Sequence, residues 1–535
     1  MLEKDPAILK IDTKRSVPLT HAAQAALVVL ALCAAPSNWA QNQATRTPAP
    51  SAALPNLGDG AAMAPAAERR LGDRIARSLY RDPDYVDDPV IMDYVQGIWQ
   101  PLLASARLRG ELPPELDEAY AWQILLGRDR TVNAFALPGA YFGVHLGLVA
   151  VVGSRDELAS VMAHELSHVT QRHIARMIAR QSEQAPWMVG AMILGVLAAS
   201  KNPGAANAMI VGGQAASVQS QLNFSRDMER EADRVGFGIF SDAGFEQQGF
   251  VGMFEKLQQA SRLNDAGGFP YLRSHPLTTE RMADMQARIG PPDVAIKGKG
   301  FTGNPTVHAL VAARAKVLAN GAVDALRTWT AEADPVQLAR LAPAQQAGVL
   351  YGATLAALKL RDYAGATALW SRLDAALRSD AAAAPYARWL RAELWLAQGN
   401  GASALATLQV KPPKEAASRT RTELFLFAQA ATQAGQAALA TQDLQTWVAD
   451  HPGDAQAWQL LSNAYVAQRR VIAAIRAEAE VYVAQQDNPA ALARLKAAQD
   501  MVRKGGAVAD HFEASILDTR TRQLELLVRE QALER

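Results

Sequence analysis

The stretch His164-Glu165-Leu166-Ser167-His168 places two histidines four residues apart, with a glutamate directly after the first. On an α-helix, side chains four residues apart lie on one face, so both imidazoles can reach a single metal ion. The Glu165 carboxylate would then lie beside the open coordination position. There it can take a proton from a water molecule and return it to a leaving amine. This combination indicates metal-assisted hydrolysis of a peptide bond.

The residues around this motif have helical spacing, because apolar side chains recur at Leu158, Val161, Met162 and Leu166. No glycine or proline interrupts the segment before Pro186, so we predict one helix that continues through Ile174. Such a helix would pack with one face and present the metal ligands with the other. The alternative is two histidines that occur by chance on a solvated helix.

A third metal ligand is predicted in the segment Ser-Arg-Asp-Met-Glu-Arg-Glu-Ala-Asp at 225–233. Glu229 and Asp233 are four apart, so Glu229 can bind the metal while Asp233 accepts the ring N–H of a ligand histidine. Glu231 is a rival ligand, although it points about 200° away from Glu229 on a helix. Taken alone, the segment also fits a surface helix whose acids pair with interleaved arginines.

These features resemble the gluzincin peptidases of the HtpX-like and CAAX-prenyl-protease-like group. The Glu-x-x-Ala-Asp sequence at 229–233 carries the resemblance together with the His-Glu-x-x-His motif. Three further stretches match the pattern of that family: 133–139 followed by Gly147-Leu148, 168–173, and Ser274-His275-Pro276 with Arg281. The resemblance covers roughly residues 69–290. It implies a zinc metallopeptidase domain with one zinc ion per chain, built from helices and a small β-sheet with an edge strand.

Carried over by position, the resemblance implies that the metal ligands are His164, His168 and Glu229, and that Glu165 is the general base. We also assign Asp233 to the catalytic site, where its carboxylate would orient a ligand histidine. His145 and His173 are more readily explained as residues that pack or that orient a ligand.

The resemblance also implies a substrate-binding edge strand at Asn133, Ala134 and Phe135. His275 has two interpretations: a structural histidine in a closing loop, or a site residue that stabilises an oxyanion or occupies the fourth zinc position. The resemblance favours the site role. For Arg281, anchoring a substrate carbonyl and capping a helix are equally compatible with the sequence.

The N-terminus has the pattern of an export signal. Basic residues at 10, 14 and 15 precede an apolar run of about 14 residues, too short to span a bilayer and typical of a signal peptide. We therefore predict a signal peptide at 1–40, a disordered linker at 41–68 and a periplasmic location. An uncleaved anchor is the alternative. The chain has one cysteine, Cys33, which lies in this run.

A second apolar segment, 187–199, is also too short to span a bilayer. We predict that it forms a buried hairpin between the two metal-binding helices. The alternative is a flap over the site or a peripheral membrane contact. The net charge of the whole chain is +1, which gives no indication of a nucleic-acid partner.

The remainder of the chain, 305–535, differs from the preceding part because its predicted helices occur in pairs. In the segment 455–487, Trp458, Leu461, Tyr465 and Ala474 have the spacing of a tetratricopeptide repeat. Weaker pairs begin near residues 346, 385 and 422, and a degenerate one near 305. Because one pair cannot bury its apolar face alone, we predict an α-solenoid, closed by a final helix at 510–535. An ordinary helical bundle is the alternative.

Together these features predict a mainly α protein in which a zinc metallopeptidase domain at 69–290 precedes a tetratricopeptide-repeat solenoid. The resemblance implies an exported metalloendopeptidase that cleaves misfolded or stalled envelope and outer-membrane proteins. The implied partner of the repeats is the outer-membrane β-barrel assembly complex. The alternative is a periplasmic chaperone or scaffold with a latched metal site. The presence of Glu165 favours the enzyme, because a purely structural zinc site does not require it.

Overall fold

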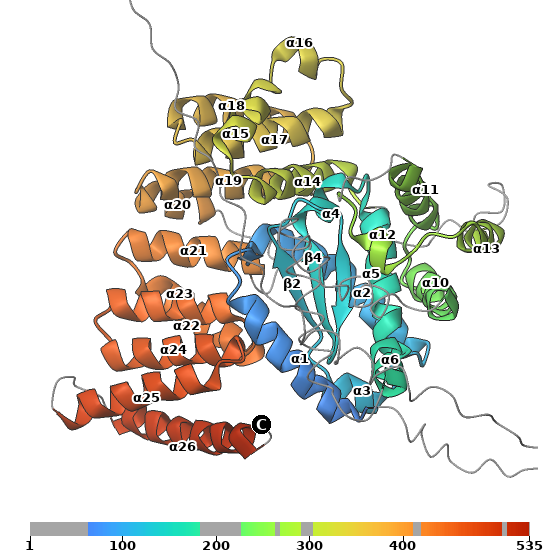
Figure 1. Cartoon of the computed structure of the whole chain (residues 1–535). Helices are drawn as coiled ribbons and strands as arrows, with labels where there is room; N and C mark the ends of the chain where they lie inside the picture. The colour runs from blue at the N-terminus through green and yellow to red at the C-terminus, as the bar shows by residue number, and fades with distance from the viewer. Residues whose placement is uncertain are drawn as a thin grey trace, which may run out of the picture. The chain divides into compact units, whose positions relative to one another are not determined.

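The computed structural model describes residues 63–181, 226–262, 268–289, 303–409, 419–504 and 511–533. The predicted signal peptide, most of the linker and the apolar segment 187–199 lie outside the described residues. An α/β part extends to residue 289, and a helical part begins at residue 303 (Figure 1). No helix in the described ranges combines the length and apolar character needed to cross a membrane.

The α/β part contains a four-stranded sheet in which β1 (Tyr85–Val86), β2 (Gln123–Gly127), β4 (Tyr141–His145) and β3 (Ala134–Leu137) follow one another in space. Strands β2 and β4 are parallel, and the other two pairs are antiparallel. Among the described residues, β3 pairs only with β4, so it lies at an edge of the sheet, as predicted. Gly139, in the turn between β3 and β4, has φ +71°, a left-handed conformation that glycine adopts without steric cost.

Helices pack on both faces of this sheet. Leu71 and Ile75 of α1 (Pro65–Tyr80) contact Leu125 and Tyr141 on one face. Helices α2 (Pro89–Leu108) and α5 (Arg155–Thr170) pack on the other. The other helices that the structure describes in this part are α3 (Pro114–Ala119), α4 (Leu146–Val151), α6 (His173–Gln181), α10 (Arg226–Asp242), α11 (Gln248–Arg262), α12 (Tyr271–Ser274) and α13 (Thr279–Ile289).

Helix α1 corrects the predicted end of the linker. The linker was expected to reach residue 68, but α1 starts at Pro65, where proline at the first helical position is favourable. Burial of Leu71 and Ile75 against the sheet accounts for this early start. The α/β part therefore includes these N-terminal residues.

Helix α5 carries the His-Glu-x-x-His motif and differs from the prediction in two ways. Every residue from Leu158 to Thr170 is buried, so the helix is covered all round and has no solvent-facing side for the ligands. It also ends at Thr170, and Arg172 adopts φ +52° before α6 begins at His173. The single helix predicted through Ile174 is thus two helices, separated by a turn that no glycine or proline marks.

Helix α10 lies close against α5. A Cβ atom added at Gly236 would lie 3.1 Å from Ala163 O and 3.1 Å from Ser167 Oγ, so a larger residue would push the helices apart. The two helices pack along each other, and the first turn of α10 places Glu229 beside His164 and His168.

The described residues of the helical part form a series of helices, several of which begin close to the predicted starts near residues 305, 346, 385, 422 and 455. They are α14 (Pro305–Ala319), α15 (Val323–Ala331), α16 (Pro335–Leu338), α17 (Pro343–Lys359), α18 (Tyr363–Leu377), α19 (Ala384–Ala397), α20 (Gly401–Leu408), α21 (Arg421–Gln433), α22 (Ala438–Asp450), α23 (Ala455–Ala467), α24 (Val471–Ala484), α25 (Asn488–Arg503) and α26 (His511–Leu533). From α17 to α26, each helix packs against the next. The last, α26, buries Leu517 and Leu524 in a cluster that it shares with α25.

Two arginines, the buried Arg314 and the partly exposed Arg421, connect the helical part to the start of α2. Arg314 of α14 contacts Asp88 at 2.7 Å and Glu393 at 2.6 Å. Arg421 of α21 contacts Asp87 at 2.7 Å. Because a buried charge is stable only when paired, these contacts hold the two parts in one arrangement.

Candidate metal centre and active site

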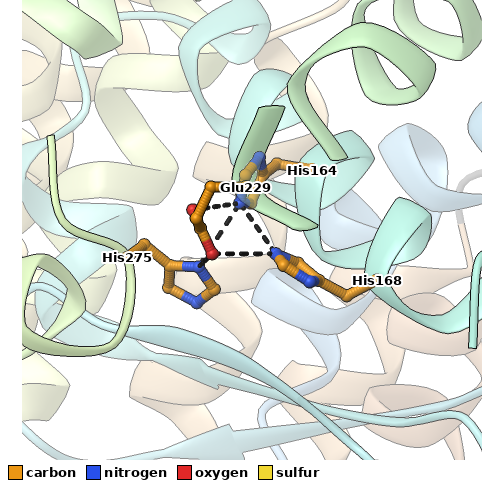
Figure 2. A group of neighbouring side chains, drawn as sticks. All are labelled: His164, His168, Glu229 and His275. Atoms are coloured by element: carbon orange, nitrogen blue, oxygen red, sulfur yellow. Dashed lines mark hydrogen bonds and ion pairs between the residues drawn. The ribbon is translucent and has the colours of Figure 1, made fainter. Parts of the chain in front are cut away.

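Four buried side chains from three parts of the chain converge at one point. His164 and His168 come from α5, Glu229 comes from the first turn of α10, and His275 follows α12 directly. Each of them contributes one possible ligand atom, and these atoms lie within 4.8 Å of one another. Figure 2 shows the polar atoms of all four side chains directed at each other. The structure therefore brings the three predicted ligands together and adds His275.

Most of the distances between these atoms are close to the edges of a tetrahedral metal site. His164 Nε2 lies 3.0 Å from His168 Nε2 and 3.3 Å from His275 Nδ1, and His275 Nδ1 lies 3.0 Å from Glu229 Oε1. Glu229 oxygens lie 3.4 Å from His164 Nε2 and 3.6 Å from His168 Nε2 (Figure 2). A tetrahedron with zinc-to-ligand bonds of about 2.0–2.1 Å has edges of about 3.3 Å. Three imidazoles and a carboxylate are donors that suit zinc.

Glu165 lies beside this cluster, with its two carboxylate oxygens in different environments. Oε2 accepts a hydrogen bond from the backbone N–H of Ala136 on the edge strand, at 3.1 Å. Oε1 lies 3.3 Å from His275 Nε2, and the side chain of Tyr271 also interacts with this carboxylate. Burial raises the pKa of Glu165, although the nearby His275 and His164 oppose this rise. A buried carboxylate next to ligand-type imidazoles fits a site that holds a metal and a water.

Asp233 lies behind His164, on the side away from the cluster. Its Oδ1 atom is 3.0 Å from His164 Nδ1, as expected for a carboxylate that accepts the ring N–H of a ligand histidine. Burial disfavours the charged imidazole. The hydrogen bonds to Asp233 and Glu229 outweigh it and raise the pKa of His164 to about 9.

Arg281 departs from both of its predicted roles. Its guanidinium is buried and donates to both oxygens of Asp233, at 2.6 and 2.8 Å, and to the backbone carbonyl of Pro276 at 2.9 Å. It also lies 2.8 Å from Glu229 Oε2. The Arg281 side chain therefore pairs with two acidic residues of the site. It neither anchors a substrate carbonyl nor caps a helix. Burial of two carboxylates next to the cluster requires such a counter-ion.

His173 and Glu231 lie behind the second histidine of the motif. His173 Nδ1 is 2.8 Å from His168 Nδ1, and His173 Nε2 is 3.1 Å from Glu231 Oε2. Burial lowers the pKa of His173 to about 4, so its ring is neutral at neutral pH. Glu231, the rival ligand, is not part of the metal cluster and contacts His173 and Arg176 instead.

The residues predicted to bind substrate lie on or next to β3, but their side chains do not all face the cluster. Phe135 packs over Gly143 and lines a cavity of about 270 Å³ that also touches His145, and no member of the metal cluster lines this cavity. Asn133 is buried, and its carbonyl accepts the backbone N–H of His145. Ala134 begins the strand and is also buried. The direct link from this edge to the site is the Ala136 N–H, which no side-chain pattern could have indicated.

Tyr271 was not identified from the sequence. Its ring stacks on His275, with centroids 4.6 Å apart and an interplanar angle of 28°. Its backbone N–H donates to Val132 O, just before the edge strand, at 3.3 Å. The loop that carries His275 is therefore joined to the chain that leads into β3. The only sequence signal was an aromatic residue one helical turn before His275.

Comparison with known proteins shows that this region is similar to a peptidase family. Residues 100–289 match the sequence model of peptidase family M48. A Vibrio cholerae protein named "Putative beta-barrel assembly-enhancing protease" is 33% identical over 60% of this chain, and the chain spans 63% of that protein. The beta-barrel assembly-enhancing protease of Escherichia coli is 27% identical over 86% of this chain and 90% of its own length. The mitochondrial metalloendopeptidase OMA1 of Saccharomyces cerevisiae is 26% identical over 36% of this chain and 54% of its own length.

Proposed function

The chain carries a peptidase family M48 domain at residues 100–289, and we propose that it is an exported zinc metalloendopeptidase of the cell envelope. The observation that supports this most strongly is that His164, His168 and Glu229 surround one point and that the buried carboxylate of Glu165 lies beside it. A structural zinc site is closed by four protein ligands and has no use for a glutamate that does not bind the metal.

The residues divide the work of peptide hydrolysis among them. A zinc ion held by His164, His168 and Glu229 would polarise the scissile carbonyl and lower the pKa of a water molecule. Glu165 takes the proton of the attacking water and passes it to the leaving amine. Asp233 keeps the His164 ring in the tautomer that directs Nε2 to the metal.

Strand β3 supplies the surface for substrate. An exposed strand edge binds an extended peptide through main-chain hydrogen bonds, with little dependence on the side chains of the peptide. Because Ala136 of this strand already contacts Glu165, a peptide paired with β3 would have its backbone next to the general base. Unfolded or misassembled proteins offer such extended segments. We therefore propose misfolded or stalled envelope and outer-membrane proteins as substrates, in keeping with the names of the Vibrio cholerae and Escherichia coli relatives.

The helical part is proposed to be a tetratricopeptide-repeat solenoid that binds the substrate or docks on the outer-membrane β-barrel assembly complex. Support comes from the described helices α17 to α26, each of which packs on the next. Arrays of this kind present extended surfaces for peptides and proteins. Export through the segment 1–40 would place the enzyme in the periplasm, with the segment 187–199 as a candidate for peripheral membrane contact.

A second function, that of a chaperone or scaffold with a latched metal site, is favoured by the position of His275. Its Nδ1 atom stands at the fourth corner of the tetrahedron, 3.0 Å from Glu229 and 3.3 Å from His164. An imidazole at that corner excludes the water that Glu165 would deprotonate. We propose that this contact holds the protease inactive until a substrate engages.

Removal of the metal tests the protease directly. We expect the purified mature protein to cleave casein slowly, to lose this activity after dialysis against a strong zinc chelator, and to regain it with stoichiometric zinc. Dialysis with added magnesium and no zinc serves as the control, because magnesium prefers oxygen ligands to this imidazole-rich set. Cleavage that survives removal of zinc would contradict the proposal.

A further inference from the structure

We propose that His173 is a positioning residue for the metal ligand His168, acting in a relay that ends at Glu231. In this relay, Glu231 determines which ring nitrogen of His173 carries the hydrogen. His173 in turn determines which ring nitrogen of His168 carries its hydrogen. The inference rests on the metal site of the proposed function, but it concerns the strength of metal binding and is independent of proteolysis.

The contacts form one continuous chain away from the metal point. His168 directs Nε2 to the cluster, while its Nδ1 lies 2.8 Å from Nδ1 of His173. On the far side of the His173 ring, Nε2 lies 3.1 Å from Glu231 Oε2. The same oxygen accepts a hydrogen bond from Arg176 at 2.7 Å. His173 is 0% exposed, so no water competes for its ring atoms.

Only one arrangement of hydrogens satisfies this chain when a metal is bound. The bond to the metal uses the lone pair on Nε2 of His168, so the hydrogen of that ring must be on Nδ1. It is donated to Nδ1 of His173, which must therefore carry a lone pair. The His173 hydrogen is then on Nε2 and is donated to Glu231, which is an acceptor only. Each hydrogen bond determines the next, and the carboxylate at the end excludes the opposite tautomers.

The two motif histidines are thus supported in different ways. His164 meets a carboxylate directly, since Asp233 lies 3.0 Å from its Nδ1. For His168 the carboxylate is one imidazole further away, and its charge is shared with Arg176. Partial negative charge passed through His173 makes the His168 nitrogen a better donor to the metal.

The local backbone is consistent with a role that depends on position. Arg172, between α5 and α6, adopts φ +52°, a conformation that is unfavourable for residues other than glycine. This turn changes the direction of the chain before α6. As a result, the His173 ring contacts the His168 ring edge-on, with centroids 4.8 Å apart and an interplanar angle of 73°. A continuous helix would have carried residue 173 away from the outer nitrogen of His168.

The test is the zinc dissociation constant of the purified full chain, measured by competition with a chromophoric chelator. We expect His173→Leu to bind zinc roughly 10- to 100-fold more weakly than the parent. His173→Asn keeps an acceptor oxygen near the position of Nδ1 and should lose less. Glu231→Gln removes the charge but keeps an acceptor, so its loss should also be smaller than that of His173→Leu. Glu280→Gln, which alters an exposed partner of Arg230, is the matched control and should bind zinc like the parent.

Thermal unfolding of the metal-free variants separates positioning from packing. If His173 only filled space, the apolar His173→Leu would be at least as stable as His173→Asn in this buried site, and the zinc affinities would follow the stabilities. The relay predicts the opposite order for zinc affinity, with His173→Asn above His173→Leu. A zinc dissociation constant of His173→Leu equal to that of the parent would overturn the inference.

If His173→Leu does not fold, Glu231→Gln tests the relay instead, because the Glu231 side chain is 30% exposed and tolerates replacement. An unchanged dissociation constant in that variant would then count against the relay. A parent that binds zinc but cleaves no protein contradicts the proposed protease and leaves the relay in place. A parent that binds no zinc overturns both.

Discussion

Glu165→Gln is expected to bind zinc like the parent and to cleave casein about 10²- to 10⁴-fold more slowly, the usual contribution of a general base. Glutamine has the size of glutamate, and its amide oxygen can still accept the hydrogen bond from the Ala136 N–H. It cannot take a proton from the attacking water. Zinc content by elemental analysis and initial cleavage rates, measured on the same preparation, check both halves of this expectation.

Glu157→Gln is the matched control, because Glu157 lies on the same helix and carries the same group. Its carboxylate accepts the backbone N–H of Gly153 at 2.6 Å and pairs with Lys256 at 2.5 Å, away from the metal cluster. We expect this variant to keep both zinc and most of its activity. If Glu165→Gln cleaved casein within about tenfold of the parent, another group would have to be the base.

His275→Ala is expected to cleave casein about tenfold or more faster than the parent while still holding zinc, with weaker affinity. The gain follows if the open form of the parent is populated at about 10% or less, because removal of the imidazole clears the fourth corner in every molecule. Three ligands remain, the number usual for a catalytic zinc site. Steady-state kinetics together with the zinc dissociation constant provide the measurement.

His308→Ala is the control for the loss of a buried histidine elsewhere. The His308 ring contacts Tyr94 Oη at 2.7 Å and Val152 O at 2.9 Å, and its removal should lower stability without any gain in cleavage. For His275→Ala, unchanged zinc affinity and unchanged cleavage would mean that the histidine is structural. A large loss of cleavage with zinc retained would instead assign it to oxyanion stabilisation.

The parts of the site that the sequence indicated are those encoded by short spacings. The interval between His164 and His168 and the interval between Glu229 and Asp233 each reflect one helical turn, which local periodicity specifies. The edge strand at 134–137 and the helices from 305 onward also follow from local patterns and turn residues. These features needed no knowledge of the tertiary fold.

The parts that escaped prediction depend on contacts between distant segments. The burial of α5 on all sides requires α2, α10, α11 and the sheet, which no local pattern reports. Arg281 looked like a residue available to substrate because its two acidic partners, Asp233 and Glu229, lie about fifty residues earlier. The break before His173 has no glycine or proline to mark it, so the sequence allowed a ligand-orienting role for His173 but not its contact with the outer nitrogen of His168.

The central claim is that one metal ion lies between His164, His168 and Glu229. The most direct measurement is an anomalous difference map from crystals of the purified protein, collected on both sides of the zinc absorption edge. We predict a single strong peak about 2.0–2.1 Å from Nε2 of both histidines and at a similar distance from a Glu229 oxygen. The resting enzyme should also show His275 within bonding distance. A map with no zinc peak at this point, in protein that cleaves casein, would contradict the account.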